Sequence, residues 1–197
     1  MRSYAYDLDS GLLEALTDAN ENTTEYSYNA LRELQSVQLD VTGLRNATGM
    51  SAQYTYAQGR MTGLTYGGFQ YGFTYDLWGN VTQVTMNGSS LVSYDYGTAA
   101  HKGQVQTTTY GNGQQVFYSY NALGQVETVG YTGQLNRFQY AYDAEGALSQ
   151  VYDAILEETT VYTENGYTVY NAANAVVYSH VSGDDDTSTE VVGIYTV

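Results

Sequence analysis

Pairs of aromatic residues separated by one small residue recur along the chain, and an acidic or amide residue follows each pair. Five clear copies place these residues at Tyr4, Tyr6 and Asp7; Tyr26, Tyr28 and Asn29; Phe73, Tyr75 and Asp76; Tyr118, Tyr120 and Asn121; and Tyr140, Tyr142 and Asp143. Residues two apart on a β-strand share a face. Each copy therefore predicts a strand with two aromatic side chains on one face and a small side chain on the other.

Three weaker copies extend the pattern through most of the chain. They place aromatic pairs at Tyr54 and Tyr56 and at Tyr94 and Tyr96, and a single Tyr170 before Asn171. Successive second aromatics are then 19 to 28 residues apart, a period typical of a structural repeat. Stacked units would align the aromatic pairs into a ladder, in which each cross-strand pair contributes about 0.2–1 kcal/mol and each buried phenol needs a hydrogen-bond partner.

A turn is predicted directly after each aromatic pair. Three copies combine Asp or Asn with a glycine three residues later: Asp76 with Gly79, Asn121 with Gly124, and Asp143 with Gly146. This combination is typical of a type I turn whose glycine takes a positive φ in a following bulge. Arg32 occupies the glycine position in the second copy, so either Arg32 is left-handed or that turn differs; Asn174, in the last copy, adopts this conformation more readily.

Apolar residues follow the turn at two and at five positions after the glycine slot. The pairs are Leu13 and Leu16, Leu34 and Val37, Met61 and Leu64, Val81 and Val84, Val126 and Val129, and Leu148 and Val151. A spacing of three breaks the alternation of a strand, so we expect either a bulge between the two residues or a sheet partly covered on its second face. A helix also has this period, but the segments between glycine-rich turns are too short for one.

Composition supports an all-β chain and excludes some partners. The 197 residues include 23 Tyr and 21 Gly but no Pro or Cys, and aromatic residues favour strands while glycine marks turns. The net charge of −15 repels phosphate backbones, so we expect no nucleic-acid binding. No apolar stretch approaches the roughly 20 residues of a membrane span, so we expect no membrane insertion. The absence of cysteine leaves the cellular compartment open.

The repeated residues resemble the YD-repeat, or Rhs-repeat, family. The copy most similar to the family pattern runs from Phe73 to Val81, and the segment from Thr109 to Gln114 is similar to one that precedes many family units. The resemblance covers about residues 4 to 178. Because Tyr4 already belongs to a repeat, we expect the N-terminus to be a boundary within a longer protein.

The resemblance implies both a fold and a role. In this family, tandem antiparallel β-hairpins form one long, twisted and curved sheet that spirals into a hollow shell, of which 197 residues make an open arc or a partial barrel. Bacterial relatives resemble polymorphic toxins and insecticidal toxin-complex components whose shell holds a C-terminal toxin, and teneurins are animal relatives. The implied partners are the rest of the shell and the polypeptide that it encloses, and the implied location is secreted or at the bacterial cell surface.

One departure from the family limits what the resemblance carries over. Relatives with self-cleaving shells have a motif with Pro and Asp near the end of the shell, and this chain has no Pro. No toxin-releasing activity is therefore assigned to any residue. The chain also lacks a recognisable toxin domain.

The chain divides by sequence into a repeat array and a tail. Residues 1–178 form an array of about eight units, and residues 179–197 contain an acidic loop from Gly183 to Glu190 before the apolar segment Val191 to Val197. The apolar segment is either a terminal strand or the beginning of a further, truncated repeat.

No catalytic, cofactor-binding or metal-binding residue is predicted. Asp184, Asp185 and Asp186 are consecutive and lack the alternating spacing of a calcium loop. His101 and His180 stand in no metal-ligand or nucleophile pattern. Glu157 and Glu158 are adjacent on a predicted strand and so face opposite ways, unlike the facing acids of a glycosidase. The acids Asp7, Asp76 and Asp143 all have the same role in turns.

Sugar binding is the main alternative function, because aromatic rings and strand-borne amides suit sugar rings. Trp78, in a turn, is the candidate glycan contact, although packing against the next repeat explains it as well. Acceptor motifs for N-glycosylation begin at Asn22, Asn46, Asn80 and Asn87, which have little meaning in a bacterial protein. Exposed strand edges also favour self-association.

We therefore predict a non-catalytic structural segment of a secreted or surface YD-repeat protein that encapsulates or displays a C-terminal toxin or effector. The alternative is a carbohydrate-binding or adhesive module of a cell-wall-associated protein.

Overall fold

A computed structural model describes residues 1–40, 50–98, 101–182 and 188–192. The described residues form eighteen β-strands and no α-helix. The chain divides into two compact units, Met1–Ser93 and Tyr94–Val197. In the first, the strands are β1 (Ser3–Tyr6), β2 (Leu13–Thr17), β3 (Thr23–Tyr28), β4 (Leu34–Asp40), β5 (Met50–Ala57), β6 (Arg60–Tyr66), β7 (Phe69–Tyr75), β8 (Val81–Met86) and the first part of β9 (Ser89–Tyr96).

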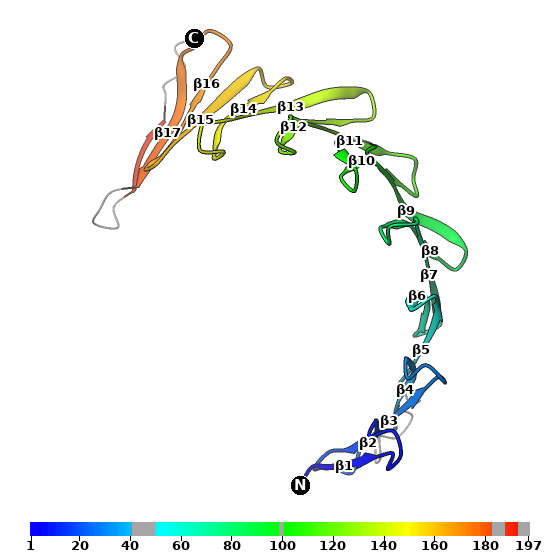
Figure 1. Cartoon of the computed structure of the whole chain (residues 1–197). Helices are drawn as coiled ribbons and strands as arrows, with labels where there is room; N and C mark the ends of the chain where they lie inside the picture. The colour runs from blue at the N-terminus through cyan, green and yellow to red at the C-terminus, as the bar shows by residue number, and fades with distance from the viewer. Residues whose placement is uncertain (41–49, 99–100, 183–187, 193–197) are drawn as a thin grey trace. The chain divides into compact units, whose positions relative to one another are not determined.

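The second unit continues with nine further strands. They are β10 (Val105–Tyr110), β11 (Gln115–Tyr120), β12 (Val126–Tyr131), β13 (Gln134–Tyr142), β14 (Leu148–Asp153), β15 (Glu158–Thr163), β16 (Gly166–Tyr170), β17 (Val176–Ser182) and β18 (Ser188–Val192). Within each unit, every strand pairs antiparallel with the strand before it and the strand after it, as successive hairpins (Figure 1). The prediction of an all-β chain of tandem antiparallel hairpins is confirmed.

A β-bulge lies opposite the second aromatic residue in seven of the eight copies. In the second copy Tyr28 pairs with Leu34 and Tyr26 pairs with Val37, so Gln35 is the additional residue on the returning strand. The same shift occurs at Tyr6, Tyr56, Tyr75, Tyr120, Tyr142 and Tyr170. The predicted bulge between the two apolar positions is therefore confirmed, and it lets both apolar residues share the face of the tyrosines.

The two faces of each sheet differ in chemistry. We name as the aromatic face the one with Tyr26, Tyr28, Tyr54, Tyr56, Tyr71, Phe73 and Tyr75 in the first unit and Tyr118, Tyr120, Tyr131, Phe138, Tyr140 and Tyr142 in the second. We name as the hydroxyl–amide face the one with Ser27, Ser36, Ser51, Gln53, Thr55, Thr65, Gln70, Thr74, Gln83 and Thr85, and with Ser119, Thr128, Gln139, Gln150, Thr159 and Thr168.

Hydroxyl pairs link neighbouring strands on the hydroxyl–amide face. The side-chain oxygens of Ser27 and Ser36 are 2.7 Å apart, and those of Ser119 and Thr128 are 2.8 Å apart. Such cross-strand pairs stabilise a sheet without burying apolar surface. Where the small residue between the two aromatics is a serine, as in these two copies, it is thus part of a polar ladder.

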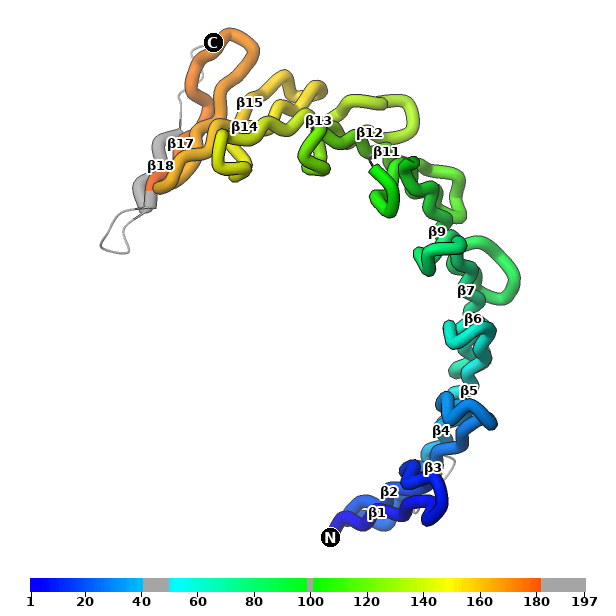
Figure 2. Tube along the Cα trace, viewed as in Figure 1, coloured from blue at the N-terminus to red at the C-terminus, as the bar shows by residue number. Residues whose placement is uncertain are grey.

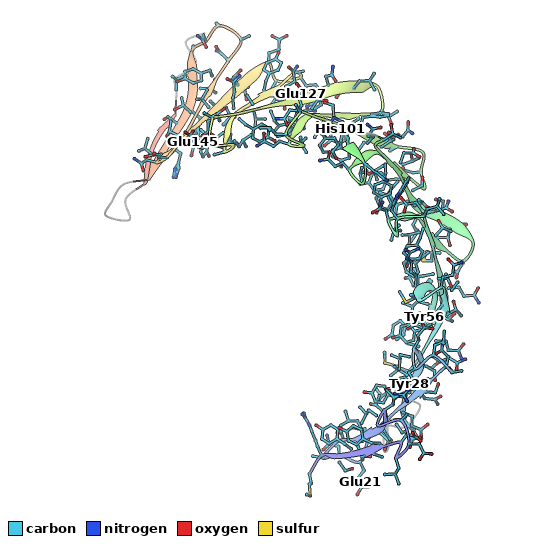
Figure 3. All side chains as sticks on the ribbon, viewed as in Figure 1. Glu21, Tyr28, Tyr56, His101, Glu127 and Glu145 are labelled. Carbon is cyan, nitrogen blue, oxygen red and sulfur yellow. The ribbon has the colours of Figure 1, made fainter. Side chains whose placement is uncertain are left out.

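The eighteen strands belong to one sheet, which is a single layer with very little interior in each unit. Among the described residues other than glycine, only Val116 and Thr108 are buried, at 8% and 6% exposure, and they face each other across β10 and β11. The trace shows no second layer over the strands of either unit (Figure 2). Side chains project from both sides of the ribbon (Figure 3). The fold is therefore stabilised by strand pairing and by contacts along the faces more than by a closed core.

The predicted division at residue 178 stays a prediction. Strand β17 crosses that position without a break and pairs with β18. A terminal strand thus exists, but residues 183–187 and 193–197 lie outside the described part. That pairing is compatible with both sequence interpretations of the tail.

Candidate functional site

The repeated turns are built around one acidic or amide side chain. Asp76 Oδ1 accepts hydrogen bonds from the backbone N–H groups of Trp78 and Asn80, each at 2.9 Å, and its Oδ2 accepts one from Asn80 Nδ2 at 2.8 Å. Partial burial raises the pKa of Asp76, but the hydrogen bonds from Asn80, Trp78 and Gly79 outweigh it, so the pKa lies below its usual value. A carboxylate held ionised in this way is poorly suited to act as a general acid.

The amide copies use the same geometry. Asn121 Oδ1 accepts from the backbone N–H groups of Leu123 and Gln125, each at 3.0 Å, while its Nδ2 donates to Gln125 Oε1 at 2.9 Å. Asn29 makes the equivalent bonds with Leu31 and Glu33. Because Asp and Asn exchange freely in this role, the position does not require an ionisable group.

The first turn is one residue longer than the others. Gly11 N–H donates to the carbonyl of Asp7, and Ser10 N–H donates to Asp7 Oδ1 at 2.6 Å. The side-chain hydrogen bond from Ser10 is the largest cause of the lowered pKa of Asp7. In this first copy Leu12 N–H donates to Ser10 Oγ, so the longer turn also has a different side-chain hydrogen-bond pattern.

The fourth turn position has a positive φ in each well-formed copy. Gly79, Gly124 and Gly146 have φ of 96°, 79° and 86°. Arg32 has φ 63° and Asn174 has φ 62°. The alternative left open for Arg32 is thus decided, since this residue itself takes the left-handed conformation.

In four copies the second tyrosine reaches back to the preceding repeat. Tyr28, Tyr75, Tyr120 and Tyr142 donate their hydroxyls to the backbone carbonyls of Leu13, Met61, Val105 and Val126, at 2.6–3.0 Å. The acceptors stand two positions after the glycine slot, so one short segment supplies both an apolar side chain and a carbonyl. The phenol thus links one hairpin to the next and satisfies its own polar tip. Figure 3 labels one of these phenols, Tyr28.

Replacing Tyr142 with phenylalanine is expected to lower the free energy of unfolding by about 1 kcal/mol, because the carbonyl of Val126 loses its 2.7 Å partner. Tyr140 is the matched control, since it stands on the same strand and no hydrogen bond of its hydroxyl is present in the described part. Urea denaturation of both variants measures the effect. Equal losses in Y142F and Y140F would contradict the link.

A second set of links crosses the turns. Gln104 Nε2 donates to the carbonyl of Gly124 at 2.6 Å, and Gln125 Nε2 donates to the carbonyl of Gly146 at 2.9 Å. In the first unit, the Arg60 guanidinium takes the equivalent place, and a Cβ on Gly79 would lie 2.8 Å from its Nη2. The residue after the turn glycine therefore contacts the next turn. The sequence analysis missed these links, although a long polar residue at this position was a visible signal.

An ion pair joins β13 and β14 near their ends. Arg137 Nη2 and Nε bond to the two carboxylate oxygens of Asp153 at 2.7 and 2.8 Å, and the guanidinium lies 4.9 Å from the ring centroid of Phe138. The hydrogen bond from Arg137 lowers the pKa of Asp153 to about 2. The sequence analysis did not find this pair, because its partners are 16 residues apart in an uncertain register.

The Arg137–Asp153 pair predicts a loss of stability in acid. Above the ordinary carboxyl pKa of 3.8, the ion pair makes its full contribution to the free energy of unfolding. This contribution disappears as the pH falls towards about 2, the pKa of Asp153 in the folded chain, because the unfolded chain takes up the proton first. Denaturation of the wild type and of D153N between pH 5 and 2 measures the difference in the free energy of unfolding between the two proteins. We expect this difference to shrink towards pH 2, and a pH-independent difference would contradict the prediction.

The last copy of the pattern has the opposite orientation. Val151 pairs with Thr160, and Thr160 pairs with Val169, so Val169 stands on the aromatic face and Tyr170 on the hydroxyl–amide face. The turn at Asn171 follows β16, which runs antiparallel to β11 and β13. It therefore lies at the other edge of the sheet from the turns at Asn121 and Asp143. A change of register by one residue moves a whole strand's side chains to the other face.

Other aromatic residues continue the aromatic face beyond β14. Tyr162 and Tyr167 pair across β15 and β16, and the ring of Tyr167 also contacts Tyr178 and His180 at centroid distances of 5.6 and 5.7 Å. His180 is thus a packing residue on this face. His101 contacts the ring of Tyr120 and has its Nδ1 3.1 Å from Gln104 Oε1.

Trp78, the candidate glycan contact, lies in the turn after β7 with 64% of its surface exposed. Its backbone N–H is part of the Asp76 turn. The sugar-binding role of Trp78 stays a prediction.

The acids do not gather into a site. Within the described ranges, no group of three or more His, Cys, Asp or Glu side chains is arranged to hold a metal ion. Asp184, Asp185 and Asp186 lie outside those ranges. Glu157 stands in the turn before β15, with φ 54°, and Glu158 opens that strand opposite Asp153.

In the part of the chain that is described, no helix is long and apolar enough to cross a membrane.

Comparisons with known proteins are consistent with this architecture. The sequence model of the Teneurin YD-shell family matches residues 2–163. A curated relative from Bacillus spizizenii, described as tRNA3(Ser)-specific nuclease WapA, is 29% identical over 155 residues, which are 66% of this chain and 7% of that protein. The chain therefore spans only a small part of the relative that it matches.

Solved structures match over nearly the whole chain. The crystal structure of TcdB2-TccC3-Cdc42 matches with a TM-score of 0.71 and 12% sequence identity. The match covers 96% of this chain and 11% of the solved chain. The crystal structure of TcdB2-TccC3 without its hypervariable C-terminal region matches with a TM-score of 0.71 and 13% sequence identity. That match covers 94% of this chain and 11% of the solved chain. At these identities the likeness concerns the fold.

Proposed function

Because this chain belongs to the Teneurin YD-shell family, we propose that it is a non-catalytic wall segment of a larger shell that encloses or displays a toxin or effector polypeptide. The observation that carries this proposal is the set of links between repeats. Tyrosine hydroxyls join neighbouring hairpins in both units, and glutamine amides do so in the second unit. The repeated residues are thus used in building a wall, and none of them is arranged around a reacting atom.

The single-layer sheet also supports a wall. Because both faces of each unit are open along most strands, other parts of a longer protein would have to cover whichever face is shielded. The small shares of the relatives that this chain spans, 7% and 11%, suit one segment among many. In this proposal the partners are the remaining repeats and the enclosed polypeptide, and the longer protein is secreted or lies at a bacterial cell surface.

The described charges do not favour one face for a cationic cargo. Acidic residues stand in turns, as Asp76, Asp143 and the labelled Glu21 and Glu145 do (Figure 3). Others stand in strands on either face, as Glu25 does on the hydroxyl–amide face and Asp153 on the aromatic face. We therefore propose enclosure by steric exclusion, with no charge-based holding of the cargo.

Proteolysis of the longer protein that carries these repeats tests the enclosure. A polypeptide encoded after the repeats is expected to resist a protease until the shell is denatured. The control is the same polypeptide expressed without the shell, which should be cleaved at once. Equal cleavage rates in the two proteins, or a reading frame with no polypeptide to enclose, would overturn the proposal.

A further inference from the structure

Asn-Gly dipeptides stand at three of the hairpin turns. They are Asn87–Gly88, Asn112–Gly113 and Asn165–Gly166. Asparagine is a thermolabile residue, because the backbone nitrogen that follows it can attack the carbonyl carbon of its side chain. Glycine leaves that nitrogen the least hindered, since it has no Cβ. Each dipeptide is therefore reactive unless the fold holds the asparagine side chain or the glycine nitrogen in place.

The side chain of Asn87 is held by the neighbouring strand. Its Oδ1 accepts a hydrogen bond from the backbone N–H of Gln70 at 2.9 Å. With φ of 51° and 80°, Asn87 and Gly88 also form the kind of two-residue turn that matches the twist of a hairpin. The Asn87 side chain therefore has to leave Gln70 before its carbonyl carbon can approach the nitrogen of Gly88.

Both reacting groups are held at Asn112. Its Oδ1 accepts a hydrogen bond from the backbone N–H of Gln114 at 3.0 Å. The N–H of Gly113, which must lose its proton for the nitrogen to attack, donates to the carbonyl of Tyr110 at 2.8 Å. The second dipeptide is therefore protected at the side chain and at the attacking nitrogen.

Asn165 differs because no partner holds its side chain. It is exposed, and its side chain takes part in no hydrogen bond with any described residue. Glu164 and Asn165 form the two-residue turn between the paired residues Thr163 and Gly166. Neither turn residue has the positive φ that suits a hairpin loop of this length. The Asn165 side chain is therefore free to rotate, in a turn that matches the twist of its strands poorly.

The glycine of this third dipeptide is required by the sheet. Gly166 pairs with Val181 of β17, and a Cβ on Gly166 would overlap the backbone carbonyl of His180. A larger residue would have to separate β16 from β17. Strand packing thus keeps a glycine directly after the exposed asparagine.

We propose that Asn165 is a site of spontaneous deamidation, with water as the only co-reactant. The nitrogen of Gly166 forms a bond to Cγ of Asn165, the bond from Cγ to Nδ2 breaks, and the side-chain nitrogen leaves as ammonia with the proton of the Gly166 N–H. Water then opens the succinimide ring at one of its two carbonyls. The product at position 165 is an aspartate or an isoaspartate, and in the isoaspartate the main chain runs through the former side chain.

The isoaspartate loosens the pairing of β16 with its neighbours. It adds a methylene to the main chain directly before Gly166, so the register of Gly166 against Val181 has to shift. The next residue, Tyr167, has its ring centroid 5.6 Å from that of Tyr178, and this contact shifts with it. The modification is therefore a slow, irreversible change in the second unit.

Peptide mapping by mass spectrometry, after incubation of the whole folded chain at pH 7 and at pH 9, tests the site. We expect Asn165 to be converted at least tenfold faster than Asn87 and Asn112. Conversion should be faster at pH 9, because the attacking nitrogen must lose its proton. The same chain in guanidinium chloride is the matched control, in which the three dipeptides should react at similar rates. In N165Q, whose longer side chain has to close a larger ring, position 165 should stay unmodified.

Hydrogen exchange tests the effect on the sheet. In the purified isoaspartate form, the backbone amides of β16 and β17 are expected to exchange at least tenfold faster than in the unmodified chain. N165D, which adds the charge without the methylene, should exchange like the unmodified chain.

Two results would overturn the site: no conversion of Asn165 in the folded chain, or conversion of Asn87 or Asn112 at an equal or higher rate. Unchanged hydrogen exchange in the isoaspartate form would overturn the effect on β16. None of these measurements depends on an enclosed polypeptide, so this proposal and the wall role can fail separately.

Discussion

Replacing Gly130 with alanine is expected to lower the free energy of unfolding by at least about 3 kcal/mol. Gly130 lies in β12 opposite Phe117 of β11, and a shift in register on its other side brings β13 close to it. A Cβ at this position would overlap the backbone carbonyl of Leu135. Because backbone atoms are in the way, no side-chain rotation relieves the overlap, and β12 and β13 must separate.

Gly133→Ala is the matched control for this prediction. Gly133 is in the adjoining turn with φ 83°, and a Cβ there would meet nothing within 4 Å. Only the left-handed backbone then opposes the substitution, at a cost of about 1 kcal/mol. Urea denaturation followed by circular dichroism compares the two variants. If G130A is as stable as G133A, the close approach of β13 to β12 is incorrect.

The second large effect is expected at Val116, where an aspartate should lower the free energy of unfolding by about 3 kcal/mol or more. Val116 is 8% exposed and pairs with Thr108, the other buried residue of the described part apart from two glycines. A carboxylate at this position loses water without gaining a cationic partner. The loss should be smaller in acid, because burial raises the pKa of the new carboxyl and its neutral form costs less to bury.

Val181→Asp is the control for a strand valine that is not buried. Val181 is 51% exposed in β17, so its aspartate keeps most of its water and the expected loss is below about 1 kcal/mol. Thermal denaturation of both variants at pH 7 and at pH 4 provides the comparison. Similar losses in V116D and V181D would mean that the Val116 and Thr108 pair adds no local core.

Both sensitive positions lie outside the repeated pattern. Gly130 and Val116 are in neither the aromatic pair, the turn, nor the two apolar positions. Their importance follows from where β10, β11, β12 and β13 meet. Mutations chosen from the pattern alone would therefore miss the two largest effects expected here.

Sequence and structure agree most closely at the turn and the bulge. The turn at Asp76 follows from the hydrogen-bonding capacity of one side chain and the φ of one glycine, and both are local properties. The bulge opposite Tyr75 follows from the three-residue spacing of Val81 and Val84, since no regular strand places both on one face. Such features are encoded within about ten residues of chain, so the sequence is sufficient to predict them.

The candidate sites were harder to predict. Trp78 stood out in the sequence because it is the only tryptophan. The reversed orientation of the last copy did not stand out, because Tyr170 belongs to a copy that resembles the others. Which face receives Tyr170 depends on the pairing of β14 with β15, and a shift of one residue there reverses the answer.

The sequence by itself thus determined the strand type, the turns, the bulges and the common face of each aromatic pair, because these depend on alternation and on backbone preferences within one hairpin. Only the tertiary structure decided which carbonyl receives each tyrosine hydroxyl, where Arg137 finds Asp153, and which way the last copy faces. The hydrogen-bond partners among them are residues 14 to 16 apart in sequence, so they depend on the register between strands. The registers are set by many weak cross-strand contacts acting together, and no single residue specifies them.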